Sequence, residues 1–394
     1  MINRESADNT ARYIRLWRRS ATSALVALAG VAASVNPASA ATRSYVVSWF
    51  TQGMYSTEND CPGGINPPIE KQWVKDLMDL GMTRDEAQAI VVRVGNGDRS
   101  AHDIIVNRGR INGQPVNAYN NPQAVKDPMM VAVDSKYGVG FNLDGKGAAS
   151  PNGFEDPETG EKGVNNQMAR ALGCIFNLRA KPPLRSSDTE QWWHLIQDYQ
   201  PAWLISIDAD DFKNSSTAKI TFDRALEHPS WDANSETRRN MTYRIDPDPR
   251  SHTEIKGSIK DGVFHAATEQ TLFMVGDLLV MPALELHKTH VRIKIQEDGS
   301  LDGYLGGYQP WVQVYFPIAA GGNAFEMNVA HDIPGIYYLL KKNADAEPDP
   351  KTGENTAISA TWRIEAVPSF NVPIETAKSG TKNGGGQQAS ISSR

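Results

Sequence analysis

The chain has 394 residues, and its acidic side chains outnumber its basic ones by 46 to 40, which gives a formal net charge of −6. This balance disfavours nucleic acid and anionic membrane surfaces as partners, because both attract basic proteins. Two cysteines alone cannot make a structural zinc site, which needs four ligands.

Residues 1–40 have the pattern of an export signal. Four arginines between positions 12 and 19 precede the apolar run ATSALVALAGVAASV, and Ala38-Ser39-Ala40 supplies a small-residue cleavage pattern. The run is too short to span a membrane, and no later apolar run approaches that length. Arg18-Arg19 resembles a twin-arginine signal, but bulky apolar residues do not follow it, so general secretion is favoured. The prediction is a periplasmic or secreted protein.

Cleavage after residue 40 would remove five Arg and two acidic residues from totals of 40 and 46. The remaining 354 residues would carry 35 basic and 44 acidic side chains, a formal charge of −9. This length permits one large or two moderate domains with an ample core.

Residues 41–200 predict a mixed α/β region. A strand is expected at Tyr45–Phe50, where β-branched and aromatic residues dominate. Helices are expected at Pro68–Leu80, Thr83–Val94 and Val164–Leu172, and a fourth begins at the capping box Ser187-Asp-Thr-Glu190. The first two form a helical hairpin packed on a sheet.

Residues 201–377 alternate between apolar and polar side chains over short segments such as AWLISID, TAKITFD, HVRIKI and PWVQVYF. In HVRIKI the residues Val291, Ile293 and Ile295 share one face, as in a half-buried antiparallel strand. These segments predict a mainly β fold with small helical elements, in which a jelly-roll-like antiparallel β-sandwich follows the mixed N-terminal region. A short helix is expected at Ile336–Lys342. The polar tail, residues 378–394, is predicted to be disordered.

The two cysteines, Cys61 and Cys174, both follow the signal. In an oxidising compartment an isolated pair most simply forms a disulfide. The alternative is two buried free thiols.

The acidic loop, residues 138–174, is rich in Gly, Asn, Asp and Glu. Crowded side-chain oxygens are the ligands that calcium prefers, although Lys146 and Gly153 exclude an EF-hand. The candidate metal ligands, which include two carboxylates beyond the loop, are Asn142, Asp144, Asp156, Asn165, Asn166, Asp208 and Asp210. The alternative is a solvated loop of turn residues. Asp156–Glu161 favours that alternative, because Asp349–Glu354 repeats its pattern with few ligands nearby.

A second candidate site is the stretch YLGGYQPW, in which Tyr304, Tyr308 and Trp311 surround two glycines. Aromatic rings beside a free backbone can form a shallow platform on which a sugar stacks. Alternatively, the rings fall into the core beside a hairpin turn.

The sequence contains no cofactor fingerprint and no complete catalytic constellation. The leading hypothesis is an exported, calcium-stabilised β-rich binding protein for a small molecule or glycan. One alternative is a hydrolase that acts on polysaccharide or another polymer through Asp208, Asp210 or Asp211. Another is an envelope scaffold.

Overall fold

The computed structural model describes residues 41–179, 193, 200–277, 281–329 and 332–374. The predicted signal, the polar tail and the predicted helix after Ser187, apart from the helical residue Trp193, lie outside the described residues.

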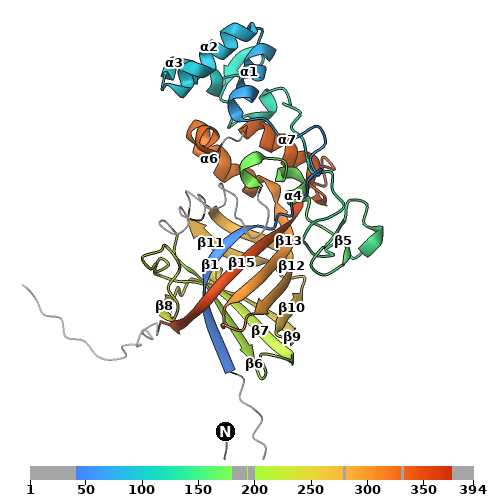
Figure 1. Cartoon of the computed structure of the whole chain (residues 1–394), viewed down its shortest axis with the longest axis vertical. Coiled ribbons are helices and arrows are strands. Elements are labelled where there is room, and N and C mark those ends of the chain that lie inside the picture. The colour runs from blue at the N-terminus through green and yellow to red at the C-terminus, as the bar shows by residue number, and fades with distance from the viewer. Residues whose placement is uncertain (1–40, 180–192, 194–199, 278–280, 330–331, 375–394) are drawn as a thin grey trace, which may run out of the picture. The chain divides into compact units, whose positions relative to one another are not determined.

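Eight antiparallel strands close into a β-barrel. They are β1 (Ala41–Gln52), β6 (Trp203–Ala209), β7 (Ser215–Arg224), β9 (Thr253–Lys260), β10 (Val263–Ala267), β12 (Met281–Ile295), β13 (Leu301–Pro310) and β15 (Asn355–Pro373). Each strand pairs with the next in this order, and β1 pairs with both β6 and β15. Figure 1 shows the blue β1 beside the red β15.

The prediction of a jelly-roll-like sandwich is therefore wrong, although the mainly β class is confirmed. A sandwich and a barrel need the same alternation of apolar and polar residues along each strand. They differ in which distant strands pair. Here Tyr45 lies opposite Ile205 in β6 and opposite Pro368 in β15, so β1 closes the sheet.

Large apolar side chains fill the barrel. Phe50 stacks on Trp362 with ring centroids 4.8 Å apart and meets the edge of Trp203 at 5.0 Å. Ile205 and Phe264 are fully buried. These side chains belong to one large apolar core.

Additional short strands lie around the barrel. β8 (Met241–Ile245) pairs with the end of β15 in parallel, while β11 (Leu272–Asp277) and β14 (Ala346–Pro348) pair with β12 and β15. Two small hairpins are β2 (Gly109–Ile111) with β3 (Gln114–Val116), and β4 (Phe154–Glu155) with β5 (Lys162–Val164). The 3₁₀ turns are η1 (Pro122–Ala124), η2 (Gly147–Ala149), η3 (Phe176–Leu178) and η4 (Pro249–Ser251).

The first three helices are α1 (Ile69–Asp79), α2 (Arg84–Gly95) and α3 (Arg99–Val106). They confirm the helical hairpin, in which the capping box at Thr83 is formed with Glu86 as its partner. The predicted packing of this hairpin on a sheet is wrong, because Trp73 of α1 donates to Glu326, which lies within Trp311–Val329. The helices share their own apolar core, in which Trp73 and Leu77 are fully buried. Together, α1–α3 form the helical module.

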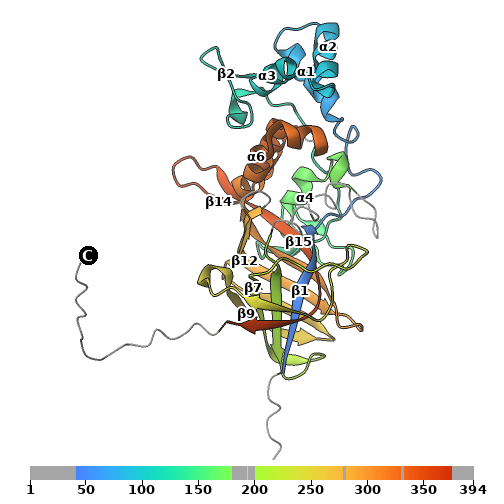
Figure 2. The same ribbon diagram turned by 90° about the vertical axis from the view of Figure 1, so that its left-hand side faces the viewer.

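Three further helices are α4 (Gln167–Leu172), α6 (Trp311–Val329) and α7 (Ile333–Asn343). Figure 2 shows α4 and α6 beside the end of the barrel at which β15 begins. The strand predicted from PWVQVYF is wrong, because these residues open α6. Trp311 and Ile318 are buried and Phe316 is exposed, which is a helical spacing that a short, wholly apolar run conceals.

The acidic loop packs on the outer face of the barrel. Phe141 covers Gly306 of β13, where an added Cβ would lie 2.2 Å from the Phe141 ring. Glycine is therefore required at position 306 to let the loop approach the strand. Within the described ranges, every helix falls short of the length and apolarity needed to cross a bilayer.

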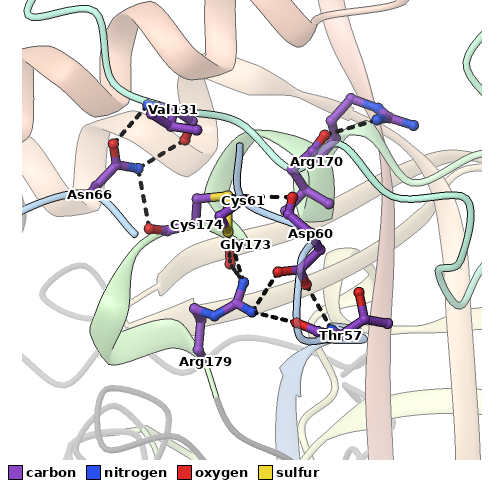
Figure 3. Close-up of a disulfide and its surroundings, with 10 residues drawn as sticks. Thr57, Asp60, Cys61, Asn66, Val131, Arg170, Gly173, Cys174 and Arg179 are labelled. Atoms are coloured by element: carbon purple, nitrogen blue, oxygen red, sulfur yellow. Dashed lines mark hydrogen bonds and ion pairs between the residues drawn. A yellow bond between two sulfur atoms is a disulfide. The ribbon is translucent and has the colours of Figure 1, made fainter. Parts of the chain in front are cut away.

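The predicted disulfide between Cys61 and Cys174 is present, with Cα atoms 5.7 Å apart (Figure 3). It joins the segment after β1 to the end of α4. Arg179 lies beside it and donates to Asp60 Oδ1 at 2.6 Å and to the Cys61 sulfur at 3.1 Å. Asn66 adds a bond to the Cys174 carbonyl at 3.2 Å, so the bridge sits within a polar network.

Candidate functional site

The predicted calcium ligands in the acidic loop accept hydrogen bonds from the protein itself. Asn165 Oδ1 accepts from the backbone amides of Leu143 and Asp144 at 2.9 and 3.2 Å. The Asp144 carboxylate accepts from the Ser150 hydroxyl at 2.9 Å, and Asn142 Oδ1 accepts from a backbone amide at 3.1 Å. The loop oxygens are thus stabilised by donors, which removes the repulsion that motivated a cation.

Asp156 and Asn166 have structural partners as well. Asp156 is fully buried and accepts from the Arg292 guanidinium at 2.8 Å and from the Glu158 amide at 2.8 Å. Asn166 donates to the Gly53 carbonyl at 2.8 Å, and its oxygen caps α4. These bonds fasten the loop to the barrel wall and to the residue that follows β1.

Asp208 lies far from the acidic loop. It faces Thr42 near the start of β1, whereas Asn166 bonds Gly53 just past the end of that strand. Eleven residues of extended chain span roughly 36 Å. The loop and Asp208 therefore cannot share one ion.

The three carboxylates proposed for hydrolysis are held in local bonds, and Asp211 accepts from the Lys213 amide at 2.8 Å. Asp208 accepts from Lys219 Nζ at 3.1 Å, and Asp210 accepts from the Ser215 hydroxyl. The bond from Ser215 lowers the pKa of Asp210, whereas a general acid needs a raised pKa.

Among the residues that the structure describes, no group of three or more His, Cys, Asp or Glu side chains is arranged to hold a metal ion. The calcium site remains a prediction from the sequence, because the described structure does not bring the predicted ligands together.

The three aromatics of the predicted platform are separated and covered. Tyr304 donates to Glu158 Oε1 at 2.7 Å beneath the acidic loop. Tyr308, 8% exposed, packs in a cluster with Phe141. Trp311 is also 8% exposed and belongs to the main core. The geometry thus corresponds to the alternative in which these rings are packing residues.

A different site is a cavity of about 790 Å³ on the outer wall over β1 and β15. A β-bulge at Ser48 places Trp49 opposite Glu365 of β15. The residues on either side of Glu365, Ile364 and Ala366, are buried in the core, so Glu365 lies on the outer face of the strand. The bulge therefore turns Trp49 outward, and its ring meets Trp193 at 5.6 Å. This Trp49 cavity has an aromatic wall.

The opposite wall of the Trp49 cavity comes from the turn between Trp231 and Thr237, which pair as a bridge, and from the residues that follow it. The Thr237 hydroxyl is buried without a hydrogen-bond partner among the described residues, and the side chain lines the cavity. Arg238, which also lines it, is exposed. Backbone amides of the turn lower the pKa of the nearby Asp232 carboxylate, so this wall presents both charges and a hydroxyl.

Sequence reasoning missed the Trp49 cavity. Trp49 lay inside a predicted strand, and a regular alternation of residues cannot reveal a bulge that turns the Trp49 side chain to the other face of the sheet. Thr237 and Arg238 lay in a connecting segment without a motif. Trp49 and Trp193 are 144 positions apart in the sequence, so their contact leaves no local signal.

No protein-family model, curated protein or solved structure matches this chain. The fold and the cavity define its class as an eight-stranded antiparallel β-barrel with a ligand-sized cavity on its outer wall.

Proposed function

We propose that the protein is an exported binding protein that holds a saccharide-like small molecule in the Trp49 cavity. Export rests on the signal pattern of residues 1–40 and is supported by the disulfide, which persists in oxidising compartments. The barrel has a supporting role in this function, since its packed core positions the wall that carries Trp49.

The chemistry of the lining favours a polar ring compound. Ligand pockets commonly measure about 300–1,000 Å³, and the volume of about 790 Å³ lies in this range. Sugars offer apolar C–H faces that stack on tryptophan and hydroxyls that both donate and accept hydrogen bonds. Trp49 and Trp193, which are 3% and 5% exposed, form an apolar floor with only a small accessible edge, while the exposed Asn234 and Arg238 offer hydrogen-bonding groups.

The observation that carries the proposal is the Thr237 hydroxyl. The Thr237 residue is 9% exposed, and its hydroxyl oxygen is fully buried without a partner among the described residues, although leaving a buried polar group unsatisfied costs roughly 1–3 kcal/mol. A ligand hydroxyl would supply the missing bond once the exposed turn residues around Thr237 shift to admit it.

Tryptophan-fluorescence titration with glucose, N-acetylglucosamine and their β-1,4-linked dimers tests this function. Thr237→Val keeps the shape of the side chain and removes the hydroxyl, so we expect affinity to fall roughly two- to tenfold, the value of one hydrogen bond. Thr242→Val is the matched control, because Thr242 is exposed on β8 and does not line the cavity.

An unchanged affinity in Thr237→Val, or wild-type protein that binds none of the sugars, would contradict the proposal. Release of monosaccharide from the dimers would instead favour the hydrolase hypothesis.

A further inference from the structure

A buried ionic cluster joins the helical module to α6 and α7, independently of the Trp49 cavity. Arg108, which follows α3, lies 2.8 Å from Asp332, 3.3 Å from Asp76 and 3.4 Å from Glu326. All four side chains are almost completely buried. One guanidinium thus faces three carboxylates, so full ionisation would leave two uncompensated negative charges in the interior.

Glu326 and Asp332 have the donors that an ionised carboxylate needs. Glu326 accepts from the Trp73 indole at 3.0 Å, the Tyr119 hydroxyl at 2.8 Å and the Ile333 amide at 2.9 Å. Asp332 caps α7 and is the carboxylate closest to Arg108. A helix N-terminus favours negative charge, so both groups are suited to the ionised form.

Of the three carboxylates, Asp76 has the fewest hydrogen-bond donors to stabilise its ionised form. It accepts one hydrogen bond, from Gln72 at 3.0 Å, and its Oδ2 has no hydrogen-bond partner among the described residues. Its ion pair with Arg108 is longer than that of Asp332. Asp76 is therefore the carboxylate best placed to carry a proton.

Among the described residues, the remaining ionisable groups around the cluster do not supply a compensating cation at short range. They are Lys75, whose ammonium donates to the Pro128 carbonyl at 2.6 Å, and the phenols Tyr119, Tyr315 and Tyr337. Tyr315 donates to the Tyr119 carbonyl at 2.7 Å, and burial raises its pKa, so it stays neutral.

We propose that the helical module docks on α6 and α7 with uptake of one proton, which Asp76 holds. Burial raises the pKa of both Asp76 and Asp332, and the neighbouring carboxylates act in the same direction. A cavity of about 40 Å³, with room for water, is lined by Asp332 and by Gln72, which donates to Asp76. The module keeps its own core, so it can separate without unfolding the barrel.

The dependence on pH has a definite sign. Docking raises the pKa of the Asp76 carboxylate above its ordinary value of 3.8. The protonated acid therefore contributes its full stabilisation of the docked state below pH 3.8, and this stabilisation is lost as the pH rises through the raised pKa. Docking should therefore weaken toward alkaline pH, by up to tenfold per pH unit for one proton until Asp76 is ionised in the docked state.

Hydrogen exchange of the full chain, expressed as protection factors between pH 5 and 8, tests the proposal. The reporters are peptides of α1–α3, because short helices are marginal in water once they lose their packing, and the barrel strands are the reference. We expect protection of the helical module to fall with pH relative to the barrel. In Asp76→Asn, which mimics the protonated acid, the fall should be absent.

Two variants complete the design. Asp79→Asn changes a carboxylate on the exposed side of α1, which pairs with Lys126 at 3.1 Å, and should keep the wild-type slope. Asp332→Asn removes the α7 cap and one negative charge of the cluster, so it should lower protection at every pH and flatten the slope. A slope that persists in Asp76→Asn, or one that disappears only in Asp332→Asn, would overturn the assignment of the proton to Asp76.

Discussion

Removal of the Cys61–Cys174 disulfide should cost a large part of the stability of this protein. The bridge joins residues 113 positions apart, which is a long loop by the standards of single disulfides. Closing a loop of this length removes roughly 16 cal/mol/K of entropy from the unfolded chain, or about 4.8 kcal/mol at 25 °C. Typical domains are stable by only about 5–15 kcal/mol.

The neighbouring contacts should limit structural damage in the folded state. Arg179 and Asp60 keep their ion pair when the sulfurs are absent, and Asn66 keeps its two bonds to Val131 at 2.7 and 2.8 Å (Figure 3). The loss should therefore arise mainly from greater freedom of the unfolded chain, and the barrel should still form.

The assay is urea unfolding followed by tryptophan fluorescence, in which the oxidised wild type is compared with the double variant Cys61→Ser and Cys174→Ser. We expect the free energy of unfolding to fall by roughly 3–5 kcal/mol. Reductant should lower the wild type toward the variant and leave the variant unchanged. A loss below about 1 kcal/mol would refute the chain-entropy reasoning for this bridge.

Two further predictions concern pH and metal. His287 lies between Glu285 and Glu347, at 2.8 and 2.6 Å, and although burial alone would lower its pKa, the two carboxylates raise it above 6.5. Its stabilising effect, roughly 1 kcal/mol at this partly exposed site, should be present at pH 6 and lost as the pH rises through the raised pKa. The stability difference between wild type and His287→Gln in urea should therefore shrink at pH 9, and an equal difference at both pH values would count against this role. For the acidic loop, chelator or millimolar calcium should leave the thermal midpoint unchanged, because protein donors already serve its oxygens, and a clear rise with calcium would restore the calcium hypothesis.

Local signals in the sequence located several elements correctly. The capping box at Thr83 and the apolar stripe before it predicted α1 and α2, because both signals act within a few residues. Asn166 is the N-cap of α4, which begins at Gln167, three residues after the predicted start at Val164. The same Asn166 was a predicted metal ligand, and the two roles look identical in sequence because both use a side-chain oxygen in a Gly-rich segment.

Where several structures share one local pattern, the sequence misled. The first residues of α6 are apolar on every side, so the spacing of apolar residues in the sequence could not distinguish a helix from a strand. The aromatics at Tyr304 and Tyr308 could face solvent or a covering segment, and the acidic loop decided the matter by packing over them.

The sequence by itself determined the mainly β class, the helical hairpin and the single cysteine pair, because periodicity, capping and oxidation depend on near neighbours or on residue counts. Only the tertiary structure decided that the sheet closes into a barrel, that a bulge turns Trp49 toward a cavity, and that Asp76, Glu326 and Asp332 share Arg108. These features depend on contacts between residues up to 326 positions apart, such as Asn371 with Tyr45, and such pairings leave no trace in the local pattern of the chain.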